Sequence, residues 1–208
     1  MPKLSQEKKA VLETMTRDAL YTAAKEILCE GGWKGLTMDK LAKRAGVAKG
    51  TVYNYFRNKQ DIVFFVIERD DEPLRRKIRL LAEETRPVED ILSEVLELIC
   101  LGLIENKRMN TAMVRAFYEG EFDWESPFED PMAETRAIVR QILQRGMDQG
   151  VFRPRDPVLL EILIDSFWMG LTESIAMGEL NDLSESLVSS VKDMILNGLL
   201  VRKEEKRE

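Results

Sequence analysis

The sequence predicts an all-α protein in which an N-terminal three-helix unit containing a helix-turn-helix precedes a larger helical domain. The 208 residues include only 12 glycines and 7 prolines, which favours long helices over many short strands. Apolar side chains recur at the three- and four-residue spacing of a helix face, and several prolines stand where a helix would begin. The pattern contains no convincing strand and no internal repeat.

The first two predicted helices have clear start and stop signals. Apolar residues of 20–28 fall on one helical face, and the pair Gly31-Gly32 ends that helix. Thr37 is placed to cap the start of the second helix, because its hydroxyl can accept a hydrogen bond from a free backbone N–H. Gly46 is placed to end it in the left-handed conformation.

A short third helix is expected over about 48–56, followed by a longer one. Asn58 is the expected N-cap of this fourth helix, and Asp61 lies in its first turn, where a carboxylate suits the helix dipole. Pro73 interrupts an otherwise helical run over 59–84. Because proline removes a backbone donor, it either kinks that helix or splits it in two.

The remaining helices are marked mainly by prolines at their first positions and by glycines at their ends. Gly146 and Gly150 bracket the end of one helix, and the last helix is expected from the Asp182–Glu185 capping pattern to about Val201. The proline starts are Arg86-Pro87, Ser126-Pro127, Asp130-Pro131 and Asp156-Pro157.

The composition excludes several classes of enzyme. The chain has no histidine, which removes Ser-His-Asp and Cys-His catalysis as well as histidine-based zinc and di-iron sites. Its two cysteines, Cys29 and Cys100, form no CxxC pair and are expected to be buried thiols. We therefore expect no metal, no cofactor and no catalytic residues.

The sequence also predicts a cytoplasmic protein. The N-terminus lacks the apolar stretch of a signal peptide. The most apolar segment, 158–177, is interrupted by acidic residues, so it is expected to be a buried helix rather than a membrane span.

Residues 37–56 have the pattern of a helix-turn-helix, in which Gly46 and Val47 make the turn between two short helices. Apolar and small residues of both helices are spaced to face inward, which leaves polar side chains of the second helix facing outward. That second helix is about 13 Å long and suits a DNA major groove about 12 Å wide. The candidate outward residues are Lys49, Gly50, Thr51, Tyr53, Asn54 and Tyr55.

A plainer interpretation of these residues stays open. Helix-turn-helix patterns also occur in bundles that never bind DNA, the tyrosines suit packing as well as phosphate contact, and Thr37 suits a cap alone. The charge distribution favours the DNA-binding interpretation. Residues 1–60 carry a balance of +6 and residues 61–208 a balance of −12, so the net charge of −6 hides a basic N-terminal part.

Residues 10–66 resemble the DNA-binding domain of the TetR family of bacterial transcriptional regulators. The resemblance implies that Lys49, Thr51, Tyr53, Asn54, Tyr55 and Lys59 contact DNA and that Thr37 contacts a phosphate. One departure is Ala48, where the family often has a serine cap. The motifs that carry the resemblance are Ala23-Ala24-x-x-Ile27-Leu28 with Gly31-Gly32-Trp33, Leu36-Thr37-Met38-x-x-Leu41-Ala42-x-x-Ala45-Gly46-Val47, and Ala48-Lys49-Gly50-Thr51-Val52-Tyr53-Asn54-Tyr55-Phe56-x-x-Lys59.

The resemblance also implies a DNA-binding domain over 1–66 and a helical ligand-binding and dimerisation domain over 67–208. Apolar residues cover most of the circumference of helix 158–177, so this helix must be buried on more than one side. It and the last helix suit a homodimer interface of four helices. The alternative is that both are buried within one chain.

A pocket for an unknown small-molecule effector is expected where aromatic and methionine side chains gather. Acidic residues interleaved among them would favour a cationic ligand, although aromatics at helical spacing also suit a core. The candidate ligand-binding residues are Met113, Phe117, Tyr118, Phe128, Phe167 and Trp168.

The sequence as a whole predicts a dimeric, ligand-responsive regulator, a repressor that a small molecule releases from a pseudo-palindromic operator in double-stranded DNA. One alternative is an interaction protein of the same fold that has lost DNA binding. A second is a helical enzyme that uses paired carboxylates.

Overall fold

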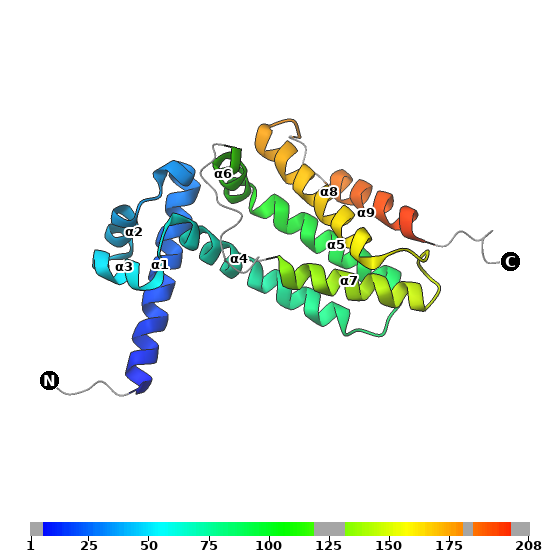
Figure 1. Cartoon of the computed structure of the whole chain (residues 1–208), viewed down its shortest axis with the longest axis horizontal. Helices are drawn as coiled ribbons and strands as arrows, with labels where there is room; N and C mark the ends of the chain where they lie inside the picture. Colours follow the sequence, from blue (N-terminus) through cyan, green and yellow to red (C-terminus); the bar gives the residue numbers. More distant parts are fainter. Residues whose placement is uncertain (1–5, 119–131, 181–184, 201–208) are drawn as a thin grey trace. The chain divides into compact units, whose positions relative to one another are not determined.

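In the computed structural model, which describes residues 6–118, 132–180 and 185–200, the regular secondary structure is helical (Figure 1). An isolated bridge between Phe152 and Leu200 is the sole strand-like pairing among these residues. The all-α prediction is confirmed. The helices are α1 (Gln6–Gly35), α2 (Met38–Ala45), α3 (Lys49–Tyr55), α4 (Lys59–Ala82), α5 (Val88–Glu105), α6 (Lys107–Tyr118), α7 (Ala133–Asp148), α8 (Pro157–Met177) and α9 (Glu185–Leu199).

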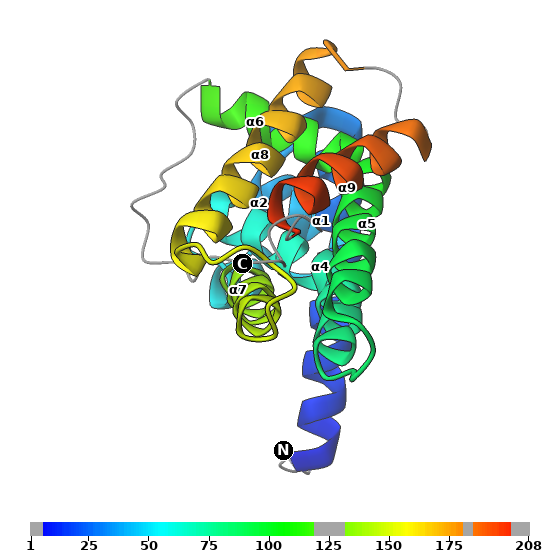
Figure 2. The same ribbon diagram turned by 90° about the vertical axis from the view of Figure 1, so that its right-hand side faces the viewer.

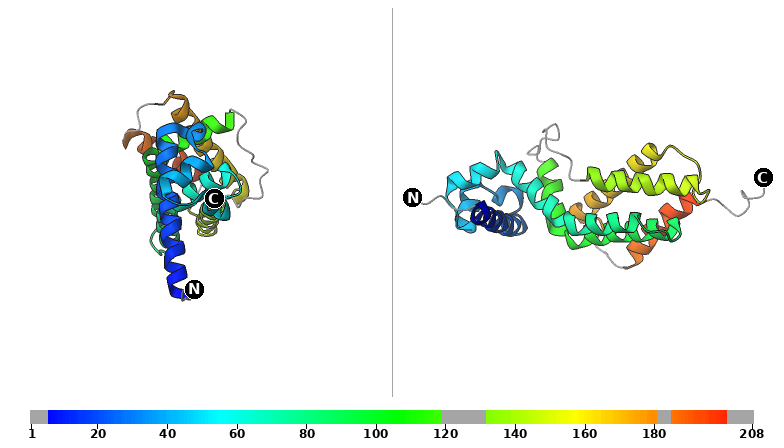
Figure 3. Two further views of the ribbon diagram at one scale, coloured as in Figure 1. Left: turned by 90° about the vertical axis from the view of Figure 1, so that its left-hand side faces the viewer. Right: turned by 90° about the horizontal axis from the view of Figure 1, so that it is seen from below.

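The described residues divide into two compact units. The first contains 6–69 and 112–118, and the second contains 70–111, 132–180 and 185–200. Helices α4 and α6 therefore each run from one unit into the other. Within the first unit, the opening turns of α1 extend beyond the helices that pack against it, and residues 6–15 are exposed (Figure 3).

Local capping explains the ends of the first helices. In α1, Gly32 has a φ of 57° and breaks the helix where the sequence predicts its end, although a further turn continues to Gly35. The Thr37 side chain accepts a hydrogen bond from Lys40 N at 3.1 Å, and Gly46 ends α2 with a φ of 67°. Both predicted caps of α2 are confirmed.

The start of α4 is held by reciprocal hydrogen bonds. Asn58 Oδ1 accepts from Asp61 N at 2.9 Å, which satisfies a free N–H of the first turn, and Asp61 Oδ2 accepts from Arg57 N, just before the helix, at 2.7 Å. The helix then continues through Pro73 to Ala82, so Pro73 does not split it.

The core of the second unit joins the C-terminal half of α4 to α5, α7, α8 and α9 (Figure 2). Phe152 follows α7 and folds back onto Gly146, where the absence of a side chain leaves room for its ring. Among the described helices, none carries an apolar stretch that could span a lipid bilayer. The most deeply buried core residues are Ile78, Ile91, Leu92, Val95, Leu96, Ile142, Leu143 and Phe152.

Some predicted helix ends lie one or two residues away from the observed ones. Pro157 begins α8 after the Asp156 cap, as predicted, but Pro87 caps α5 instead of beginning it. Helix α9 ends at Leu199 rather than near Val201. The predicted starts at Ser126-Pro127 and Asp130-Pro131, together with Asp182, lie outside the described residues.

The prediction that Cys29 is buried is wrong, and the single chain by itself covers only one side of α8. Helix α8 packs on α7 along one side, but Leu159, Ile162 and Leu163 on its other side are each more than half exposed. Apolar spacing predicts which side of a helix is covered, but it does not show whether the covering surface belongs to the same chain or to another one. Cys100 is buried as expected, whereas Cys29 is only half-buried.

Candidate functional site

Helix α3 is fixed by its inner face. Val52 is fully buried and Phe56 nearly so, and α3 packs against α2, whose Leu41 is also buried. The ring of Phe56 lies 5.3 Å from that of Phe65 on α4. Because these contacts fix the rotation of α3 about its axis, they also determine which side chains face solvent.

The outward face of α3 is polar and aromatic. Lys49, Tyr53 and Asn54 are exposed, and half of the Tyr53 side chain lies in solvent. Gly50 is also exposed, and its Cβ position is open. Thr51 and Tyr55 are half-buried, so the predicted outward set faces solvent only in part. An exposed lysine, amide and phenol on one short helix can contact phosphates and base edges.

Lys49 is paired with a carboxylate of the neighbouring helix. Its Nζ lies 2.6 Å from Oδ1 of Asp39, in the first turn of α2. This hydrogen bond raises the pKa of the Lys49 ammonium. Sequence reasoning missed Asp39, because helical spacing within α2 does not show which side chain of α3 it can reach.

Lys59 and Thr37 both have structural contacts. Lys59 Nζ donates to the carbonyl of Trp33 at 3.4 Å and lies 5.0 Å from the centre of the Trp33 ring, so it ties the start of α4 to the end of α1. Thr37 is exposed and caps α2. Each therefore has a role in the fold that does not depend on DNA.

A second basic residue near α3 is also neutralised. Arg44 Nη1 lies 2.8 Å from Glu30 and 3.5 Å from Glu26, both on α1. The balance of +6 for residues 1–60 already counts these carboxylates, so part of the basic charge near α3 lies directly beside an acid. Ion pairs of this exposed kind are weak, so a phosphate can compete with the carboxylates.

The residues predicted to form an effector pocket are described only in part. Met113 and Tyr118 lie on α6 in the first unit, and Tyr118 is more than half exposed. Phe167 and Trp168 lie on α8 in the second unit, with ring centres 5.6 Å apart. The Phe117 side chain and the whole of Phe128 lie outside the described residues.

Trp168 carries an unpaired buried donor. It packs against the core of the second unit, and its Nε1 is buried without a hydrogen-bond acceptor among the described residues. An unpaired buried N–H costs about 1–3 kcal/mol, and a bound molecule that offers an oxygen would remove this cost.

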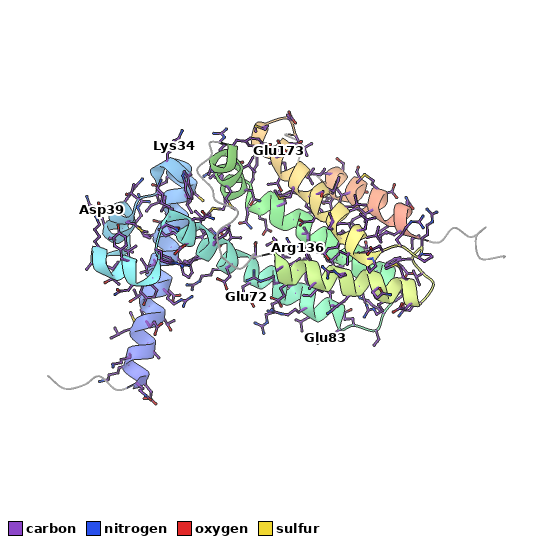
Figure 4. The ribbon with its side chains drawn as sticks, viewed as in Figure 1. Lys34, Asp39, Glu72, Glu83, Arg136 and Glu173 are labelled. Atoms are coloured by element: carbon purple, nitrogen blue, oxygen red, sulfur yellow. The ribbon has the colours of Figure 1, made fainter. Side chains whose placement is uncertain are left out.

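Buried charges in the second unit are already paired. Glu161 of α8 is buried and makes ion pairs with Arg140 and Arg136 of α7, of which Arg136 is labelled in Figure 4. Arg75 of α4 is buried beside Glu72. Glu161 therefore does not offer a free carboxylate to a cationic ligand. Within the described ranges, no group of three or more acidic or cysteine side chains is placed to hold a metal.

The N-terminal helices are similar in sequence to those of known bacterial regulators. The family described as bacterial regulatory proteins, tetR family, matches residues 20–65. The fatty acid metabolism regulator protein of Bacillus subtilis is 41% identical over 66 residues, covering 28% of this chain and 34% of that protein. An HTH-type transcriptional regulator of Staphylococcus aureus is 25% identical over 93 residues, covering 45% of this chain and 50% of the relative. The match thus spans half or less of the length of each of these relatives.

Solved structures show the same fold over most of the chain. A fatty acid degradation regulator, FadR, from Bacillus halodurans has a TM-score of 0.69 at 24% identity, covering 89% of this chain and 99% of that one. The transcriptional regulator FadR from Bacillus subtilis, solved in complex with stearoyl-CoA, has a TM-score of 0.72 at 22% identity, covering 86% and 97%. At these identities the likeness shows the fold alone.

Proposed function

We propose that this chain, whose N-terminal helices belong to the tetR family of bacterial regulatory proteins, is a ligand-responsive transcriptional regulator. It binds operator DNA as a homodimer, acts as a repressor and leaves the operator when a small molecule binds. The observation that supports this most strongly is the solvent-facing polar side of α3, held in place by a buried apolar side and contained within the matched residues 20–65.

Residues 1–66 are proposed as the DNA-binding domain and 67–208 as the effector and dimer domain. Lys49 and Asn54 are assigned to base edges or phosphates, because both present hydrogen-bonding groups from the exposed side of α3. The tyrosine hydroxyls suit phosphate oxygens. The full proposed set is Thr37, Lys49, Thr51, Tyr53, Asn54, Tyr55 and Lys59.

The dimer is proposed to form through α8 and α9. The apolar side of α8 that the described chain leaves open, together with the exposed Met194 of α9, is a surface that a second copy can cover. A two-fold axis places the same patch on both copies and sets two α3 helices about 34 Å apart, one turn of DNA. The operator should then be a pseudo-palindrome.

The effector is proposed to be an apolar molecule that carries an acceptor oxygen. The core of the second unit supplies the apolar surface, and the unpaired Nε1 of Trp168 supplies a donor. A solved protein of the same fold holds stearoyl-CoA, so long-chain acyl-CoA is the first probe to test. The proposed contacts remain Met113, Phe117, Tyr118, Phe128, Phe167 and Trp168.

Release from DNA follows if the effector binds one state of the dimer more tightly than another. Helix α4 begins beside α3 and continues into the second unit, so it is proposed to carry a movement of the effector domain to the DNA-binding domain. The effector-bound state would hold the two α3 helices at the wrong spacing. A protein that acts on operator DNA works in the cytoplasm, and no catalytic step or cofactor is assigned to it.

Selection of DNA from a random-sequence library by the purified full chain tests this function. We expect enrichment of one sequence with two inverted half-sites whose centres lie about one helical turn apart. Adding stearoyl-CoA should then release the selected duplex, with coenzyme A alone as the control. Failure to enrich any sequence would favour an interaction protein that has lost DNA binding, and turnover of the acyl-CoA would favour an enzyme.

A further inference from the structure

Helix α4 carries a proline in its interior, close to the point where the helix passes from one compact unit to the other. Along α4 the first unit ends at Arg69 and the second begins at Asp70, and Pro73 follows about one turn later. Proline has no backbone N–H, so the carbonyl of Arg69, four residues earlier, lacks its helical hydrogen bond. The hydrogen bonding within α4 is therefore interrupted at the boundary between the units.

Side-chain contacts fix α4 within the first unit before this point. Arg69 forms an ion pair with Asp18 of α1, and its guanidinium lies 4.6 Å from the centre of the Tyr21 ring. Ile62 and Val66, nearer the start of α4, are fully buried. The part of α4 that ends at Arg69 is thus held against the other helices of the first unit.

A second set of contacts fixes α4 within the second unit. A Cβ built on Gly102 of α5 lies 3.1 Å from Cδ2 of Leu74, so the backbone of α5 closely approaches this side chain. Arg75 and Ile78 are buried. Between the two sets of contacts lie residues 70–73, whose side chains are half-buried or exposed.

We propose that residues 70–73 form a joint in α4 and that Pro73 sets the range of half-site spacings that the dimer accepts on DNA. This inference rests on the proposed function. A helix bends most easily where a proline removes a hydrogen bond, and the contacts on both sides confine the bend to the joint. Helix α6 also runs from one unit to the other, but it contains no proline. Bending at the joint changes the distance between the two α3 helices of a dimer without disturbing either core.

The joint distinguishes between duplexes because the bend that it must make depends on their spacing. One base pair added between two half-sites moves one of them by about 3.4 Å and turns it by about 35°. The dimer must deform to follow, whereas the selected duplex requires little deformation. An alanine at position 73 would supply the N–H that bonds to the carbonyl of Arg69, and the deformation would then break that bond in each copy.

The first test compares the wild type with Pro73→Ala on the duplex that the wild type selects and on duplexes with one base pair added or removed between the half-sites. Pro87→Ala is the matched control, because Pro87 lies at the N-cap of α5, where a proline costs no helical hydrogen bond. Fluorescence anisotropy gives each affinity relative to the same protein's best duplex. The deformation of the DNA costs the same with each protein, so a difference between proteins reports the joint.

The expected effect follows from the hydrogen bonds that Pro73→Ala restores. One such bond corresponds to about a fivefold change in affinity, so two copies give up to about 25-fold. Pro73→Ala should therefore lose about 5- to 25-fold more affinity than the wild type on the mis-spaced duplexes. Pro87→Ala should lose as much as the wild type does.

A second test needs no DNA. Spin labels are attached through Lys43→Cys on α2 and Gln141→Cys on α7, two exposed positions, in a chain that carries Cys29→Ser and is diluted with unlabelled chain. Double electron–electron resonance then gives the distribution of distances between the two labels of one chain. Pro73→Ala should narrow this distribution, and Pro87→Ala should leave it as in the wild type.

Three results would overturn the inference while leaving the proposed function intact. They are equal tolerance of mis-spaced duplexes by Pro73→Ala and the wild type, a different best spacing for Pro73→Ala with unchanged tolerance around it, and an equally broad distance distribution. If the wild type selects no duplex, the proposed function fails and the role of the joint in spacing fails with it, whereas the distance distribution still shows whether α4 bends at Pro73.

Discussion

Gly146→Ala should destabilise the second unit, because the ring of Phe152 fills the place of the missing side chain. A Cβ built on Gly146 lies 2.1 Å from Cδ2, 2.3 Å from Cε2 and 2.8 Å from Cγ of Phe152, whereas ordinary contacts lie at 3.4–4 Å. The ring would have to retreat by more than about 1 Å, yet it is 1% exposed and surrounded by the core.

The expected loss is about 2 kcal/mol in the free energy of unfolding. Overpacking of this severity costs roughly 3 kcal/mol, and the higher helix propensity of alanine returns about 1 kcal/mol. Urea unfolding followed by circular dichroism measures the difference. The matched control is Gly31→Ala, whose Cβ meets only the tip of Lys40 at 3.9 Å and should be neutral or stabilising.

A second variant separates overpacking from other causes. In a Phe152→Leu background, which is itself less stable, the added methyl of Gly146→Ala should cost less than in the wild type, because the smaller side chain leaves room for it. If Gly146→Ala is as stable as the wild type, or if its cost is the same in both backgrounds, the close packing described for α7 is refuted.

Three further predictions address the surface, the dimer and the response to pH. Tyr53→Ala should weaken operator binding at least tenfold by anisotropy and change the free energy of unfolding by less than about 0.5 kcal/mol, because Tyr53 is half exposed; equal operator affinity would contradict the assignment. Leu163→Glu should give monomers in sedimentation velocity with unchanged helicity, because it places a charge on the open side of α8; a stable dimer would contradict that interface. Burial raises the pKa of the Asp71 carboxyl from 3.8 to about 6, so the folded state keeps a proton that the unfolded chain loses. Stability should therefore fall by up to about 3 kcal/mol as pH rises from about 4 to about 6. In urea unfolding across this pH range, Asp71→Asn should lack that decrease. An equal decrease in the variant would show that Asp71 is not the group responsible.

Local signals in the sequence predicted the helix-turn-helix well. The Thr37 cap and the Gly46 turn depend on hydrogen bonds and dihedral angles within a few residues. The residue types at these two positions are therefore sufficient to predict where α2 begins and ends. The inward side of α3 followed from apolar spacing, and Val52 is buried as that spacing requires.

Features that depend on contacts between helices were less predictable. The pair Asp39–Lys49 joins two helices whose relative placement no local pattern reports. The apolar coverage of α8 indicated burial on several sides, but sequence alone does not show that Leu163 lacks a cover within its own chain. The predicted effector residues Met113 and Trp168 lie in different compact units, so their meeting at one effector stays a prediction.

We propose that the chain binds one DNA sequence in preference to all others, through a surface that contacts both phosphates and base edges. The most direct measurement compares the affinities of the wild type for its selected duplex and for a scrambled duplex across a salt titration. We expect at least about a thousandfold preference for the selected duplex and a steep loss of affinity with salt on both duplexes. Equal affinity for the two duplexes, or binding that does not change with salt, would contradict it.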